Sequence, residues 1–129
     1  MKINHGTIFQ IYHFLEKMTL KGKPSISRAQ LKRKVFNKIV EYQKMEQDLL
    51  EEYNVETNDQ GKFSLDNKEF SQALYELRTM EVEISIDEIP FMDTFIKSII
   101  DYEGDLSGQD ADAHAELYSM LVGDNNVGS

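Results

Sequence analysis

The stretch that decides the fold is residues 27–53, SRAQLKRKVFNKIVEYQKMEQDLLEEY. Its first four residues have the form of a capping box, in which Ser27 and Gln30 would satisfy the first backbone N–H groups of a helix. Apolar residues then recur every three or four positions, which places them on one helical face. They are Leu31, Val35, Ile39, Tyr42, Leu49 and Tyr53. We therefore predict one continuous helix over 27–53, the longest in the protein, which carries much of the core.

Two charged residues of this helix, Arg28 and Glu46, fall within or beside the apolar stripe. Burying a charge is costly unless the charge is paired and hydrogen-bonded. We expect each of them to have a partner or to lie at an exposed edge.

On the amino-terminal side, the pattern predicts a shorter amphipathic helix. Its apolar face consists of Ile8, Ile11, Tyr12, Leu15 and Met18. The sequence Lys21-Gly22-Lys23-Pro24 is expected to end this helix, because Gly and Pro interrupt helices.

On the carboxyl-terminal side, residues 54–62 are polar and typical of a loop. Residues 62–65 could form a short strand, and residues 81–86, EVEISI, alternate in the manner of a half-buried strand. Between the two, Asp66–Glu69 has the form of a second capping box. The helix behind it has an apolar face of Phe70, Ala73, Leu74, Leu77 and Met80. This crossover is long enough for the two strands to pair in parallel.

Two more helices are predicted after residue 90. Pro90 suits a first helical turn, and the wide apolar face behind it indicates a central core helix. That face contains Phe91, Met92, Phe95, Ile96, Ile99 and Ile100. Gly104 can end this helix, and residues 107–110 can cap the next one. The last apolar stripe is Ala111, His114, Leu117, Tyr118 and Leu121.

These patterns predict a mainly α fold, with a long amphipathic helical hairpin and a minor two-stranded β element. The length of 129 residues suits one domain, which we place over residues 1–122. Residues 123–129 are polar, and we expect a disordered tail there.

The charges are distributed very unevenly along the chain. Residues 1–44 contain ten basic and two acidic residues, a net charge of +8, whereas residues 45–129 contain four basic and twenty-one acidic residues, a net charge of −17. The long helix begins basic and ends with Asp48, Glu51 and Glu52, the reverse of what the helix macrodipole favours. Pairing of its basic end with an acidic segment of the same chain or of a neighbouring subunit would explain this order.

We therefore predict two contact regions. One is the basic surface of the long helix, with Lys32, Arg33, Lys34 and Lys38. The other is an acidic surface with Glu81, Glu83, Asp87 and Glu88.

Several classes of function are disfavoured by composition. The chain has no cysteine, which excludes disulfides and thiol chemistry, and no apolar run approaches the roughly 20 residues that cross a bilayer. The first twenty residues lack the features of a signal peptide, so the protein is expected to stay in the cytoplasm. Nucleophile-elbow, Walker, dinucleotide-binding and HExxH motifs are all missing, and we expect no catalytic residues, cofactor or metal.

Spacing also offers candidate metal, histidine and nucleic-acid sites. Residues 56–67 and 101–112 resemble calcium loops, but the first lacks the final glutamate and the second has Leu106 at the glycine position. A helix stop and a cap explain the second segment more simply. His114 lies on an apolar face, where a hydrogen-bonded core histidine is the better interpretation. Direct nucleic-acid binding is disfavoured, because the net charge of −9 repels a polyanion.

Short blocks along most of the chain resemble a known family. They are Met1-Lys2-Ile3-Asn4, Leu20-Lys21-Gly22-Lys23, Glu51-Glu52-Tyr53, Gly61-Lys62-Phe63-Ser64-Leu65-Asp66, Glu81-Val82-Glu83-Ile84 and Leu106-Ser107-Gly108-Gln109-Asp110-Ala111. The family consists of small acidic proteins of unknown function, encoded by tailed phages and prophages of Gram-positive bacteria. The resemblance implies a phage origin, no known activity, and a role in virion assembly or as an accessory factor.

Taken together, the sequence predicts a non-enzymatic phage protein that acts by protein–protein association in the cytoplasm of the infected host cell or on the virion. The partner would be a second copy, in a homo-oligomer, or a phage or host protein. The alternative is an acidic inhibitor that imitates nucleic acid and binds a basic host protein. A small hydrolase is the third hypothesis, and it would require a deep pocket with converging titratable groups.

Overall fold

A computed structural model describes residues 1–104, 106 and 108–126 of the chain. Its elements, in chain order, are β1 (Lys2–Asn4), α1 (Ile8–Lys17), α2 (Lys23–Glu52), α3 (Lys68–Thr79), β2 (Glu81–Glu83), α4 (Met92–Ile100) and α5 (Gly108–Asn126). The fold is mainly α with a small two-stranded sheet, as predicted. α5 extends past residue 122, where we placed the end of the domain, and residues 127–129 of the predicted tail lie outside the described residues.

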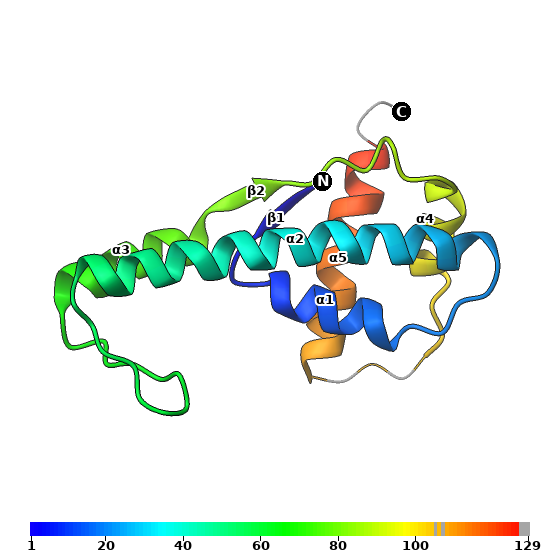
Figure 1. The fold of residues 1–129 in the computed structure, drawn as a ribbon. Helices are drawn as coiled ribbons and strands as arrows, with labels where there is room; N and C mark the ends of the chain where they lie inside the picture. Colours follow the sequence, from blue (N-terminus) through cyan, green and yellow to red (C-terminus); the bar gives the residue numbers. More distant parts are fainter. Residues whose placement is uncertain (105, 107, 127–129) are drawn as a thin grey trace.

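The long helix α2 runs along the whole molecule (Figure 1). Its first half packs with α1 and α4, α5 packs against these two helices, and the four together form a compact body. Its second half projects from the body, and α3 lies alongside it to form the predicted helical hairpin. We call residues 45–79 the arm and the other described residues the body.

The start of α2 differs from the prediction. The helix begins at Lys23, and Gly22 occupies the N-cap position with a φ of 71°, a left-handed conformation that Gly adopts readily. Pro24 lies in the first turn, where its fixed φ suits a helix. The segment Lys21–Pro24, predicted to end the first helix, therefore contains the N-cap and first turn of the second helix. Ser27 is buried inside α2 instead of capping it, and its hydroxyl donates to the Pro90 carbonyl at 2.5 Å.

The apolar stripe of α2 was predicted correctly in the body, where Leu31, Val35, Ile39 and Tyr42 are buried. In the arm, Leu50 takes the buried position and Leu49 is only partly covered. Both charged residues beside the stripe have partners, as expected: Arg28 donates to the Met18 carbonyl, and Glu46 accepts a hydrogen bond from the Tyr42 hydroxyl at 2.7 Å.

The sheet pairs two segments that we did not expect to meet. β1 and β2 are antiparallel, with Ile3 opposite Val82. The prediction of parallel pairing between residues 62–65 and 81–86 is wrong. Phe63 makes a single bridge to Thr57, because the turn between them closes locally on the Asn58 side chain. β2 pairs instead with the amino-terminal strand, whose Ile3 is buried in the body.

The ends of the remaining helices also differ in detail. α3 is capped by Asn67 and not by Asp66, since the Asn67 Oδ1 accepts from the Phe70 N–H at 3.1 Å. α4 begins at Met92, and the preceding Phe91 has a left-handed φ of 62° with an exposed ring. Ile100, also expected in the core, is exposed. The cap predicted at Ser107 lies outside the described residues.

The buried face of α5 is shifted from the predicted stripe. It consists of Ala113, Leu117 and Leu121, while Tyr118 is exposed. His114 is partly buried, and its Nε2 lies 2.9 Å from the Ile99 carbonyl, to which it donates. The predicted hydrogen bond of His114 is therefore confirmed, but the side chain is only partly buried and does not belong to the core.

Candidate interaction surface

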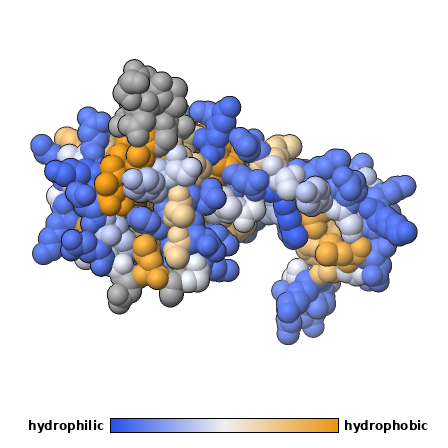
Figure 2. Space-filling model, turned by 180° about the vertical axis from the view of Figure 1, so that it is seen from behind, coloured by the Kyte–Doolittle hydropathy of each residue, from blue (hydrophilic) through white to orange (hydrophobic). Residues whose placement is uncertain are grey.

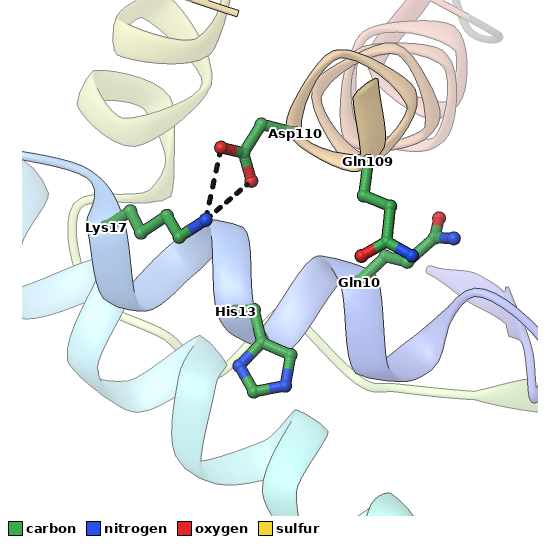
Figure 3. A pocket seen from close by; sticks show the side chains of 5 residues that line it. All are labelled: Gln10, His13, Lys17, Gln109 and Asp110. Carbon is green, nitrogen blue, oxygen red and sulfur yellow. Dashed lines mark hydrogen bonds and ion pairs between the residues drawn. The ribbon is translucent and has the colours of Figure 1, made fainter. Parts of the chain in front are cut away.

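A polar pocket of about 440 Å³ lies between α1 and the start of α5 (Figure 3). It is lined by Gln10, His13, Lys17, Gln109 and Asp110. The Lys17 Nζ lies 3.3 and 3.2 Å from the two carboxylate oxygens of Asp110, so these two charges neutralise each other. Figure 3 shows the imidazole of His13 directed away from this pair.

This pocket lacks the geometry of an active site. A catalytic acid or base has to lie within hydrogen-bonding reach of a common substrate atom. Here the imidazole does not converge with the paired charges, and the two amides lie on the other side of the pocket. Among the described residues, moreover, no three His, Asp or Glu side chains form a group that could hold a metal ion.

A second groove, of about 260 Å³, brings together residues from both predicted contact regions. Lys34, Asn37, Lys38 and Glu41 of α2 form one side, and Glu83, Ile84 and Ser85 form the other. Lys38 pairs with Glu41 at 3.3 Å, and Glu83 lies 3.3 Å from the amino group of Met1. Glu83 of the acidic half is thus balanced by the amino terminus of the same chain, whereas Lys38 and Glu41 both belong to the basic half.

The other predicted contact residues do not join this groove. Lys32 lies on a different side of α2, with its Nζ 5.9 Å from the centre of the Tyr12 ring. Arg33 is exposed, as are Glu81, Asp87 and Glu88. The eight predicted residues therefore belong to more than one surface.

Sequence reasoning missed two apolar residues on the outer side of α2. Phe36 and Val40 are 46% and 48% exposed and lie one helical turn apart. The Phe36 ring centre is 5.8 Å from that of Tyr12, so the exposed apolar surface continues onto α1. The signal was available, because a rotation of about 100° per residue places Phe36 and Val40 well off the stripe that contains Val35.

Basic residues border this apolar patch. Arg33 and Lys44 are exposed on the same side of α2. Lys32 borders the patch at Tyr12, because its Nζ lies over the Tyr12 ring. We call Lys32, Arg33, Phe36, Val40 and Lys44 the outer face of α2. Figure 2 shows the molecule from behind relative to Figure 1, and hydrophobic residues also reach the surface in this view, over the body and on the arm.

The arm is fixed to the body by a polar contact around Tyr42. Its hydroxyl accepts from the Arg78 Nε at 3.2 Å and donates to Glu46, and its ring lies 5.0 Å from that of His5. The His5 Nδ1 donates to the Leu77 carbonyl at 2.8 Å. Burial raises the pKa of the Tyr42 phenol, and the nearby Glu46 acts in the same direction, while Arg78 opposes it.

Comparisons with known proteins identify a family but no function. Residues 1–110 match the family described as protein of unknown function (DUF1617), and the chain belongs to this family. No curated protein and no solved structure matches the chain significantly. Among the described residues, no helix combines the length and hydrophobicity that a membrane crossing requires.

Proposed function

We propose that this member of the DUF1617 family acts by binding another protein chain through the outer face of α2. The observation that carries this proposal is the exposure of Phe36 and Val40 beside Tyr12, in the middle of the longest helix. Single exposed apolar residues are normal on a protein surface, but a contiguous apolar patch with a polar border is typical of a protein contact.

The composition of the outer face indicates the chemistry of its partner. Aromatic residues and Arg are enriched in protein interfaces, and both occur here. The border contains Lys32, Arg33 and Lys44, which would attract carboxylates and repel basic surfaces. The partner surface should therefore combine apolar side chains with Asp or Glu.

Association is favoured over the two other hypotheses. The polar pocket between α1 and α5 lacks converging groups, which weighs against a hydrolase. An acidic inhibitor would need free carboxylates gathered on one exposed face, and of the four predicted acidic residues Glu83 is instead paired with the Met1 amino group and lines a groove with Lys34 and Lys38. We retain protein association as the proposed mode of action.

The biological setting of the proposal comes from the resemblance to small acidic phage proteins. In that setting the protein would act in the infected host cell, as an accessory factor or during assembly of the virion. A gene located among phage structural genes would support this setting, and a gene outside any phage or prophage would count against it.

The proposal is tested by co-expressing the protein with each product of its neighbouring genes and isolating complexes from the full-length chain. A complex with one such product or with a second copy of the chain should form, and it should be lost in the Phe36→Ser/Val40→Ser double variant. Leu65→Ser is the matched control, because Leu65 is also an exposed apolar residue but lies on the arm, away from the outer face.

A complex that survives the double variant would overturn the assignment of the outer face. Circular dichroism of each variant should give the parent signal, since the substituted side chains are exposed and contribute little to the core.

A further inference from the structure

The charges of α2 are ordered along the helix, with a basic first part and an acidic end. Residues 23–44 contain seven basic residues and one acidic residue, a net charge of +6, and residues 45–52 contain four acidic residues and no basic one, a net charge of −4. The first turn has no acidic residue and the last turn has no basic residue. Each end of α2 therefore carries side-chain charge of the same sign as the partial charge of the helix macrodipole, which is unfavourable.

Contacts within the chain balance only part of this pattern. Lys38 pairs with Glu41, and Glu46 pairs with Arg78 at 3.9 Å. Among the described residues, Arg33, Lys44 and Glu51 take part in no ion pair, and Glu51 only accepts a hydrogen bond from the Gln47 amide.

One copy cannot bring its own basic and acidic halves of α2 together. Both belong to a single continuous helix, which Figure 1 shows as the axis of the molecule. With a rise of about 1.5 Å per residue, Arg33 and Glu51 are separated by roughly 27 Å. This separation is about three times the Debye length of about 8 Å at physiological salt.

We infer that a second copy of the chain packs antiparallel along the outer face of α2, with Arg33 of each copy facing Glu51 of the other. This inference rests on the proposed function and names the partner. An antiparallel arrangement places the basic half of each helix against the acidic half of the other. It also places opposite ends of the two helix dipoles together.

Helical spacing supports this contact. Arg33, Val40 and Gln47 are seven residues apart and so lie on one side of α2, and Glu51 follows Gln47 by one turn. If Arg33 faces Glu51 of the second copy, the two-fold axis crosses the outer face of α2 at the level of residue 42 along the helix. Val40 then meets the aliphatic part of Lys44 of the second copy, which can cover apolar surface while its ammonium stays in water.

A second copy fits this face better than an unrelated protein, because the chain itself carries the complementary pattern. In a two-fold dimer both subunits use the same surface, so every favourable pair occurs twice. The charge order of α2, which is unfavourable for the isolated helix, would thereby determine the antiparallel orientation and the register of the two helices in the dimer.

The inference is tested with the full-length chain by sedimentation analysis across a concentration series. The parent should form a dimer that weakens between about 0.1 M and 1 M salt, as the Debye length falls from about 10 to about 3 Å. Arg33→Glu and Glu51→Arg should each raise the dissociation constant by on the order of tenfold, since each creates two like-charge contacts per dimer. The combined R33E/E51R variant should restore the dimer, because both new pairs are again opposite in sign.

Lys34→Glu is the matched control, since it makes the same charge change on the side of α2 that faces the groove. It should leave the dimer unchanged. A parent that stays monomeric at every concentration and salt would overturn this inference, while the binding of a neighbouring gene product through Phe36 and Val40 would remain as the test of the proposed function. A dimer whose double variant is not restored would also overturn it, since another surface would then hold the copies together.

Discussion

The body and the arm share helix α2, but their cores differ greatly in size. In the body, four helices and the sheet enclose a large cluster in which Phe14, Leu31 and Phe95 are almost fully buried. In the arm, α3 rests on the end of α2 through three buried residues, Leu50, Phe70 and Leu74, with partly buried side chains around them. The same helix is therefore held by many neighbours in its first half and by few in its second.

This difference in buried apolar contacts implies that local stability differs between the two halves of α2. Buried apolar surface is the main favourable term in folding, so local opening costs least where few apolar contacts have to be broken. We expect the arm to open without the body, although no break in α2 separates them. The joint around Tyr42 and Arg78 is where the two regions meet.

The largest effect is expected from a charge in the core of the body. Ile39 is only 5% exposed, and Ile39→Asp would bury an unpaired carboxylate. We expect a loss of ~4 kcal/mol or more in the free energy of unfolding, measured by chemical denaturation. Ile100→Asp is the matched control, because Ile100 is 47% exposed and should lose little. Equal melting temperatures for Ile39→Asp and the parent would contradict the assignment of this helix to the core.

A smaller and local effect is expected at the centre of the arm. Phe70 is fully buried, and its ring centre lies 5.5 Å from that of Phe63 and 6.2 Å from that of Tyr53. Phe70→Ala removes about 3–5 kcal/mol of packing, which should exceed what holds α3 in place.

Hydrogen exchange provides the measurement. Amides of residues 68–79 should lose their protection in Phe70→Ala, while those of α1 should keep theirs. An equal loss in both regions would show that body and arm unfold as one unit, and the contrast between them would then fail.

A loss of ~1 kcal/mol is expected from removing the cap of α3. Asn67→Ala deletes the side chain that accepts from the Phe70 N–H, whereas Asp66→Ala deletes the residue that the sequence had suggested as the cap. Exchange of the first amides of α3 should accelerate for Asn67→Ala only. Acceleration for Asp66→Ala alone would mean that the cap is at position 66.

The smallest effect concerns pH and the joint between body and arm. The pKa of Tyr42 is raised above its ordinary value of 10.0, chiefly by burial. The unfolded chain would therefore lose the phenol proton at a lower pH than the folded chain. The stability that Tyr42 contributes is present below pH 10 and is lost as the pH rises towards the folded-state pKa.

Tyr42→Phe should remove this part of the pH dependence. Urea denaturation of parent and variant between about pH 8 and 11 would measure the difference, because all other titrating groups are common to both. Parallel curves for the two chains would argue that Tyr42 does not stabilise the joint through its neutral form.

The helices and their buried faces could largely be predicted from the sequence, because a spacing of three and four residues records which side of a helix is covered. The errors arise where a distant residue decides the outcome. Ser27 has the local signature of a cap but binds the Pro90 carbonyl, and β2 pairs with the amino-terminal strand instead of with a neighbour. Neither contact leaves a local pattern.

The residues of the candidate surface could be predicted from the sequence only in part, because their arrangement also depends on contacts between distant segments. The basic residues of α2 could be named from the sequence, but which of them line the groove with Glu83 depends on how the segment around β2 packs against the helix. Phe36 and Val40 could have been noticed, because they depart from the main stripe. Their exposure, however, depends on which side of α2 the other helices occupy.

The packing of α1 against α5 has a consequence for how the cell makes this protein. A ribosome adds about 5–20 residues per second, so α5 is synthesised on the order of 5–20 s after α1, the helix that it covers. The arm is finished well before that moment, because its two helices follow each other closely in sequence. During this interval Ile11, Phe14 and Leu15, which α5 helps to enclose in the finished body, are partly uncovered on the nascent chain. Chaperones would bind there first, and a stop codon ahead of α5 would leave a chain whose arm is complete and whose body stays open to proteases.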